Sequence, residues 1–259
     1  MIKKLIQLFL ILVLISPFIS CGVGNKHTIN HIVPRDSFVF LKKILTVYRC
    51  DDENGACTSV NFNYVASGYV IKVVDDGSFA VTAAHVCEDN LPPNVESKGL
   101  SSKYFVYRLD GEEYRASVLN YDIDIDACMI FIKGLTEDIE PVRISRRAPV
   151  PGDKVYNVAA PLGIYKPNIV PLLEGRFNGE DGNVALYTLP AAPGSSGSMI
   201  VNEKGELIGM VHSVYIRFPV MTLSTTYDDL INFIRYNLKK YMAYKEVMHI
   251  LNLENVFEP

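Results

Sequence analysis

Short apolar or alternating runs, each ended by Gly, Asp, Asn or Pro, fill the sequence from residue 38 to residue 216. Such runs between turn signals are typical of β-strands. Asp110-Gly111 between two of them indicates a hairpin, and residues 203–205 indicate another turn. The expected strands lie within 38–49, 60–74, 78–84, 103–109, 113–121, 126–132, 153–161, 169–177, 184–190, 198–201 and 206–216.

These runs form two groups of about six, and many short strands of this kind favour sandwiches or barrels. Residues 137–152 between the groups hold three prolines and mixed charge, which indicates a surface connector. The periodicity becomes helical only in residues 225–251, where Leu230, Phe233 and Ile234 share one face with Leu238. The chain is therefore expected to be all-β, with one C-terminal helix.

Composition limits the number of domains and the classes of binding partner. The 259 residues are 49% hydrophobic, enough for one large domain or two small ones. The net charge of −4 supplies no basic surface for phosphates, so we expect no nucleic-acid partner.

The N-terminus has the layout of a signal peptide, which we assign to residues 1–21. Lys3 and Lys4 precede an apolar run of about 16 residues, which is shorter than the roughly 20 that span a bilayer. Pro17 would break its helix, which argues against the alternative of an uncleaved anchor. The segment ending at Cys21 resembles a bacterial lipobox, so a lipid anchor on Cys21 and plain secretion both remain open. Residues 22–37 are expected to be a tether.

Export permits disulfides. If Cys21 carries lipid, four of the five cysteines remain, with three possible pairings. Cys50 and Cys57 flank a turn-rich hexapeptide, so we expect them to pair. That leaves Cys87 and Cys128 as a second pair, or as buried free thiols.

Two upstream motifs supply a base and a carboxylate. His85 in "VTAAHVC" follows an apolar run, and Ala83 and Ala84 let the backbone pack closely around an imidazole. Three alternating aspartates precede the apolar run "ACMIFI"; Asp126 adjoins it, whereas Asp122 and Asp124 lie further out. A carboxylate there could orient an imidazole. Taken separately, His85 also fits a buried structural histidine, and the aspartates fit a solvated edge strand.

The third motif is "PAAPGSSGSMIV", residues 190–201. A nucleophilic serine needs a tight turn whose backbone N–H groups point at the developing oxyanion. Among the three serines, only Ser196 has glycine both two residues before it and immediately after it, at Gly194 and Gly197. The His, Asp, Ser order along the chain is also one in which such triads occur.

The blocks "VTAAHVC", "DACMIFI" and "PGSSGSMIVNEKGELIG" resemble the signatures of trypsin-like, chymotrypsin-fold serine proteases. The last block is especially similar to bacterial exported members of the HtrA and glutamyl-endopeptidase groups. The resemblance covers about residues 38–240. It implies two six-stranded antiparallel β-barrels, polypeptide substrates, and neither a metal nor a cofactor.

The resemblance assigns the base to His85, the orienting carboxylate to Asp126, the nucleophile to Ser196, and the oxyanion hole to the N–H groups of Gly194 and Ser196. A histidine is unusual at position 212, which in the family faces the triad carboxylate. The substrate-binding residues implied by the resemblance are Leu189, Pro190, His212, Ser213 and Val214.

Three departures from the family limit the comparison. Too few residues follow the expected helix for the PDZ domain of HtrA proteins. Val211 stands where glutamyl-specific members place histidine, and no acid marks a pocket for Lys or Arg near residues 189–190. Neither specificity is therefore supported, and apolar or small side chains are the default.

The expected organisation is an N-terminal barrel at 38–140, a C-terminal barrel at 141–224 and a helical region at 225–251. The expected function is that of an exported serine endopeptidase working through an acyl-enzyme. The alternatives are an inactive protease-fold binding protein and an adhesion or structural lipoprotein with chance motifs. Oligomeric state stays open.

Overall fold

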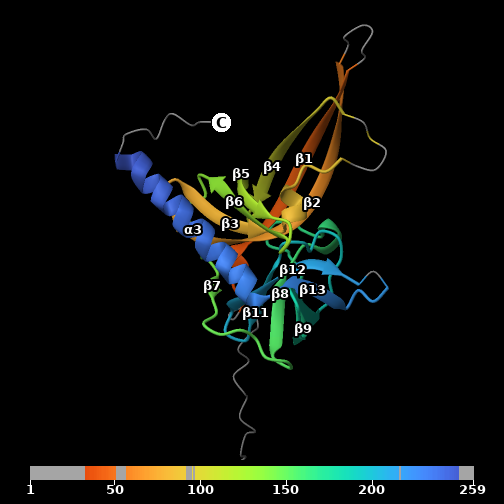
Figure 1. Ribbon diagram of the computed structural model, residues 1–259, viewed down its shortest axis with the longest axis vertical. Helices are drawn as coiled ribbons and strands as arrows, with labels where there is room; N and C mark the ends of the chain where they lie inside the picture. Colours follow the sequence, from red (N-terminus) through yellow and green to blue (C-terminus); the bar gives the residue numbers. More distant parts are fainter. Residues whose placement is uncertain (1–32, 51–56, 92–94, 96, 216, 251–259) are drawn as a thin grey trace, which may run out of the picture. The chain divides into compact units, whose positions relative to one another are not determined.

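The computed structural model describes residues 33–50, 57–91, 95, 97–215 and 217–250 (Figure 1). The signal peptide predicted at 1–21, with Cys21, and residues 22–32 of the predicted tether lie outside the described residues. Within the described part, no helix is both long enough and apolar enough to cross a membrane.

The first six strands close into a barrel in the order β1-β2-β3-β6-β5-β4. Every neighbouring pair is antiparallel. Closure leaves no strand edge unpaired around the ring. The strands are β1 (Phe38–Cys50), β2 (Cys57–Val74), β3 (Gly77–Thr82), β4 (Gly99–Tyr107), β5 (Glu113–Asp122) and β6 (Ala127–Lys133).

The second sheet has the order β11-β8-β9-β10-β13-β12-β7, and a further pairing of β11 with β12 closes six of its strands into a ring. The seventh, β7, pairs parallel to β12 outside this ring. These strands are β7 (Arg143–Ile144), β8 (Lys154–Val158), β9 (Leu172–Asp181), β10 (Val184–Thr188), β11 (Met199–Asn202), β12 (Glu206–Val214) and β13 (Met221–Thr225).

This architecture confirms the predicted fold class of two six-stranded antiparallel barrels with a C-terminal helix. Two short strands and one short helix were not predicted. The one-turn helix α2 (Ala84–Cys87) follows β3, β7 lies within the expected connector, and β13 (Met221–Thr225) lies between the last expected strand and the expected helix. Segments of two to five residues are too short to show a clear hydrophobic period, so the pattern did not reveal them.

Strands β3 and β6 are buried on both faces. Ala80 and Ile130 lie in the interior cluster of the first barrel. Their neighbours Val81 and Met129 point the other way, into a larger cluster shared with the second barrel. Two buried faces explain why the sequence of β6 is continuously apolar rather than alternating.

Helix α3 (Tyr227–Ile250) runs along one side of the molecule (Figure 1). Thr226 begins it, because its hydroxyl accepts a hydrogen bond from the N–H of Asp229 (3.3 Å) and donates to the Asp229 carboxylate (2.6 Å). Leu230 and Ile234 are fully buried in the shared cluster, as the helical periodicity predicted. Leu238 is only partly buried against it.

Candidate active site

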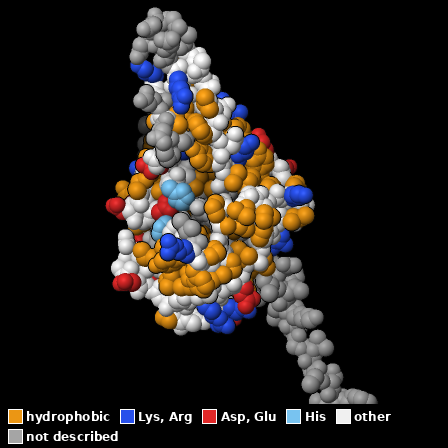
Figure 2. Space-filling view, turned by 90° about the vertical axis from the view of Figure 1, so that its right-hand side faces the viewer, with side chains coloured by type: hydrophobic (Ala, Val, Ile, Leu, Met, Phe, Trp, Pro, Cys, Tyr) orange, Lys and Arg blue, Asp and Glu red, His pale blue; other side chains and the backbone are white. Residues whose placement is uncertain are grey.

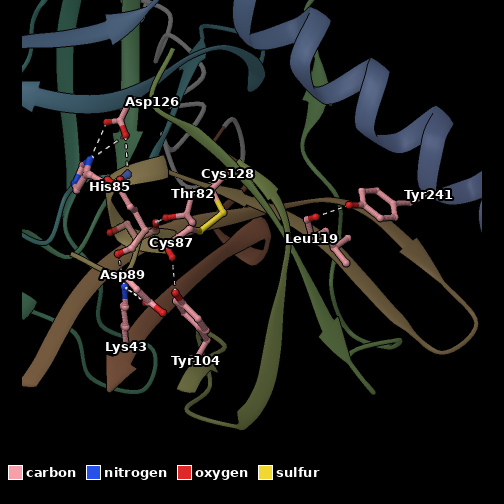
Figure 3. The surroundings of a disulfide bond; sticks show 12 residues. Lys43, Thr82, His85, Cys87, Asp89, Tyr104, Leu119, Asp126, Cys128 and Tyr241 are labelled. Atoms are coloured by element: carbon pink, nitrogen blue, oxygen red, sulfur yellow. Dashed lines mark hydrogen bonds and ion pairs between the residues drawn. A yellow bond between two sulfur atoms is a disulfide. The ribbon is translucent and has the colours of Figure 1, made fainter. Parts of the chain in front are cut away.

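His85 and Asp126 form a close pair (Figure 3). The His85 ring Nδ1 lies 2.8 Å from Asp126 Oδ2 and 3.0 Å from Oδ1. Asp126 Oδ1 also accepts a hydrogen bond from the backbone N–H of His85 (2.9 Å). If Nδ1 carries the proton of this bond, Nε2 keeps its lone pair and can accept a proton.

The backbone at Asp126 is unusual. It lies in the left-handed region, with φ 48°, at a turn where its N–H donates to the carbonyl of Ile123 (3.2 Å). Non-glycine residues adopt this region at a free-energy cost, although aspartate tolerates it better than most. The turn ends β5 and aims the carboxylate at α2 instead of continuing the strand. Asp122 instead accepts a bond from the N–H of Asp124 (3.0 Å).

A disulfide joins the segments that carry the pair. Cys87, two residues after His85, is bonded to Cys128, two residues after Asp126 (Figure 3). The carbonyl of Cys87 also accepts a bond from the Tyr104 hydroxyl (2.7 Å). This cross-link fixes α2 against β6, so that the imidazole and the carboxylate are held at hydrogen-bonding distance.

The three serines of the serine turn (residues 193–198) have different surroundings. Ser195 is fully buried, and its hydroxyl accepts a bond from the N–H of Ala192 (3.3 Å). Ser198 is fully buried, and its hydroxyl accepts a bond from Asn157 (2.8 Å). Ser196 alone of the three is partly exposed, and it lines the same two pockets as His85.

The turn requires both of its glycines. Gly194 and Gly197 have φ of 96° and 82°, where side chains are unfavourable. A Cβ at Gly197 would lie 2.4 Å from the carbonyl oxygen of Ser67, and one at Gly194 would lie 2.5 Å from that of Ala160. Other backbone segments therefore pass too close to the turn for any side chain at these two positions.

Two peptide groups of the turn are oriented by bonds to their carbonyls. The carbonyl of Pro193 accepts from the N–H of Leu162 (2.6 Å), and that of Ser195 accepts from the N–H of Ser198 (3.0 Å). In a trans peptide the C=O and the following N–H point in opposite directions. The N–H groups of Gly194 and Ser196 therefore point away from these partners.

Two pockets of about 350 Å³ each meet at His85 and Ser196. One extends past Tyr64, Val65 and Leu91. The other is lined by His85, Asp126, Ala192, Pro193, Ser196, Val211, His212, Ser213 and Val214. Figure 2 shows histidine and acidic side chains together on one face, beside a broad apolar area.

His212 lies in the second pocket with Asp126 and His85. Burial lowers its pKa below the ordinary value for histidine; the charge on Asp126 opposes this shift and that on His85 adds to it. Its Nδ1 is buried without a hydrogen-bond partner in the described structure. The ring therefore favours the neutral form.

The remaining predicted residues lie elsewhere. Leu189 is fully buried in the shared cluster, and Pro190 is exposed; neither is among the residues that line the two pockets. Cys50 and Cys57 are register partners at the ends of β1 and β2. The side chain of Cys50 lies outside the described residues, so their pairing stays a prediction.

Sequence reasoning missed Ser67 and Leu162, which contact the serine turn from distant segments. Ser67 stands inside a strand-like run, and Leu162 follows a proline in an apparent loop. No local pattern marks either residue, because the groups that they bind are backbone carbonyls of the serine turn, far away in the chain.

Comparison with known proteins identifies the family that this sequence matches. Residues 66–210, which include His85, Asp126 and Ser196, match the family model of the trypsin-like peptidase domain. A protein described as "Serine protease HtrA-like" from Staphylococcus haemolyticus is 28% identical over 178 residues, covering 62% of this chain and 26% of the relative. The chain thus matches about a quarter of that relative's length.

The fold also matches a solved structure, the serine endoprotease from Yersinia pestis, with a TM-score of 0.57. The alignment covers 80% of this chain and 64% of that one at 16% identity, so this likeness concerns the fold alone. The family model spans more than half of the present sequence, and its range holds all three motifs. The chain belongs to the family of trypsin-like peptidase domains.

Proposed function

We propose that this protein is an exported serine endopeptidase in which Ser196 is the nucleophile, His85 the general base and Asp126 the orienting carboxylate. The observation that carries the proposal is the bonded His85–Asp126 pair, which shares its pocket with Ser196. A hydrogen bond from Ser196 to His85 Nε2 is part of the proposal; such bonds often tighten only when substrate binds.

The reaction then proceeds in two halves. His85 Nε2 takes the proton as Ser196 Oγ bonds to the carbonyl carbon of the scissile peptide. The resulting imidazolium gives that proton to the leaving nitrogen as the C–N bond breaks, which leaves an acyl-enzyme. Water repeats the attack with His85 as base, and the acid product leaves as Ser196 regains its proton. Asp126 stabilises the charged imidazolium in both halves.

The backbone N–H groups of Gly194 and Ser196 would stabilise the tetrahedral oxyanion. Their orientation supports this role, because the carbonyls of the same two peptides are bonded on the opposite side. Preorganised donors of this kind contribute roughly 3–4 kcal/mol each to transition-state stabilisation.

The pocket beside Ser196 favours an apolar substrate side chain. Ala192, Val211 and Val214 line it. Its only acidic lining residue, Asp126, is bonded to His85, and no Lys, Arg or Glu is among its lining residues. We propose that β12, around His212 to Val214, pairs with an extended polypeptide there. Leu189 and Pro190 would then affect the pocket only indirectly.

Export is part of the same proposal. The residue pattern of 1–21 and the Cys87–Cys128 disulfide both favour an oxidising compartment. A lipid anchor on Cys21 and plain secretion remain the two candidate modes.

Replacing Ser196 tests the assignment. Ser196→Ala should reduce peptide hydrolysis by about six orders of magnitude or to background, because triad members act as a unit. A fluorophosphonate probe should label the wild-type protein and leave Ser196→Ala unlabelled. Ser117→Ala, an exposed serine of β5, is the control and should label normally. Equal labelling of wild type and Ser196→Ala would instead support an inactive protease-fold binding protein.

A further inference from the structure

Ser67 touches the serine turn from the opposite barrel. It is fully buried in β2 and belongs to the first barrel, whereas the turn belongs to the second. Its backbone N–H donates to the carbonyl of Ser196 (3.0 Å). Its hydroxyl donates to the carbonyl of Gly194 (2.8 Å). One residue thus binds the turn on both sides of Ser195.

The same hydroxyl binds a third segment. Ser67 Oγ accepts a hydrogen bond from the N–H of Ala160 (3.0 Å). Ala160 and the short 3-10 helix η3 (Pro161–Gly163) that follows it are called the η3 loop. A hydroxyl has one proton to donate, so donation to Gly194 leaves its lone pairs for Ala160. The carbonyl of Ser67 is itself held by the Thr82 hydroxyl (2.8 Å). The Ser67 hydroxyl thus donates to one backbone group, the Gly194 carbonyl, and accepts from another, the Ala160 N–H.

These contacts control both peptide planes that flank Gly194. The Gly194–Ser195 peptide is held directly, through its carbonyl. The Pro193–Gly194 peptide is held by the N–H of Leu162, two residues beyond Ala160 in the η3 loop. Leu162 itself adopts a left-handed φ of 55°, which a leucine keeps only when its surroundings hold it there.

Gly194 needs such restraint. With no side chain, glycine rotates about φ and ψ more freely than any other residue. Rotation of the Pro193–Gly194 peptide would change the direction of the Gly194 N–H. The Ser67 hydroxyl opposes rotation of the Gly194–Ser195 peptide directly, by its bond to the Gly194 carbonyl. It opposes rotation of the Pro193–Gly194 peptide indirectly, because it binds Ala160 of the η3 loop, whose Leu162 N–H holds the Pro193 carbonyl.

We propose that Ser67 is a positioning residue, which holds the Gly194 N–H in the orientation that stabilises the oxyanion. This inference rests on the proposed function. Ser67 is buried and does not line either pocket, so it acts only through the serine turn and the η3 loop. Its loss should slow the chemical step while leaving substrate binding and the His85–Asp126 pair unchanged.

The test compares four full-length proteins: wild type, Ser67→Ala, Ser67→Cys and Ser78→Ala. Alanine is smaller than serine and cysteine is larger, whereas alanine has no hydrogen-bonding side chain and cysteine is only a weak donor and acceptor, so the two substitutions together separate bonding from packing. Ser78 is the matched control, because it is a fully buried serine of the same barrel whose hydroxyl donates to the carbonyl of Leu135 (2.6 Å). The measurements are kcat and KM for a peptide that the wild type cleaves, the fluorophosphonate labelling rate and the thermal midpoint.

We expect Ser67→Ala and Ser67→Cys both to lower kcat by about ten- to hundredfold, somewhat less than the loss of a whole oxyanion donor. KM should stay within about twofold, and labelling should slow in proportion to kcat. The midpoint of the pH–kcat profile should not move. Ser78→Ala should lose thermal stability and keep its kcat.

Three outcomes would overturn the positioning role while the protease assignment stands: wild-type kcat in Ser67→Ala, wild-type kcat restored by Ser67→Cys, or a raised KM with unchanged kcat. If the wild type itself shows no Ser196-dependent labelling, the proposed function fails, and the role of Ser67 fails with it.

Discussion

At the scale of single residues, the environment separates chemically identical groups. Three serines share one turn, but two have buried, hydrogen-bonded hydroxyls and only Ser196 faces the pockets. The two described histidine side chains differ as well. His85 is about half exposed and bonded to Asp126, whereas His212 is partly buried and its buried Nδ1 lacks a partner in the described structure.

His212 should make stability depend on pH. Burial lowers its pKa in the folded protein, so between the folded value and the unfolded value of about 6.5 the unfolded chain binds more protons. This contribution to the free energy of unfolding is full above the unfolded value and falls as the pH is lowered toward the folded one. The free energy of unfolding, measured with urea, should therefore fall more steeply between pH 8 and pH 5 for the wild type than for His212→Gln. The same pH dependence in both proteins would contradict this prediction.

At the scale of elements, the pairing of His85 with Asp126 depends on how α2 is held. A single helical turn has too few internal bonds to be stable alone. Here the disulfide, the Tyr104 hydroxyl and the Lys43 ammonium, which donates to the carbonyl of Glu88 (2.6 Å), hold it and the residues after it. The element that carries the proposed base is thus ordered by its tertiary contacts.

Removing the disulfide should be costly for stability and for activity. The double variant Cys87→Ser, Cys128→Ser opens a loop of 41 residues and should lower the free energy of unfolding by about 2–4 kcal/mol. We expect kcat/KM to fall as well, because α2 is then less firmly held against β6. Urea unfolding and peptide hydrolysis measure the two effects. Unchanged stability would show that the other contacts suffice to hold α2.

At the scale of the whole molecule, α3 contacts both barrels. Its first half buries Leu230 in the shared cluster, and Tyr227 donates to the carbonyl of Ser145 (2.6 Å). In its second half, Asn237 accepts a bond from Asn120 of β5 (2.9 Å), and Tyr241 donates to the carbonyl of Leu119. Because the proposed site lies where the two barrels meet, their relative position matters for function.

The helix should therefore contribute strongly to global stability. Leu230→Ala creates a cavity in the shared cluster and should lower the free energy of unfolding by about 2–5 kcal/mol. Asn232→Ala, on the exposed face of the same helix, is the control and should change it by less than about 0.5 kcal/mol. Similar effects of the two substitutions in chemical denaturation would show that α3 is not part of the cooperative core.

Short-range sequence patterns determined most of the secondary structure and the identity of the candidate nucleophile. Apolar runs and turn residues predicted all the strands except the short β7 and β13, since side chains alternate along a strand and tight turns need particular residues. The helical period predicted α3, and two glycines distinguished Ser196 within its turn, because only glycine adopts those φ values freely. The family resemblance, which the comparisons confirm, supplied the closure of the strands into barrels.

Only the tertiary structure decided how these parts meet. The left-handed backbone of Asp126, the one-turn helix α2 and the contacts of Ser67 leave no periodic trace in the sequence. Ser67 and Gly194 are 127 positions apart, yet one hydrogen bond joins them. Such a bond forms only when both barrels are in place. The sequence around a serine in a strand does not show whether its hydroxyl binds a distant carbonyl. The identity of each proposed catalytic residue was therefore local information, whereas its orientation is a property of the folded molecule.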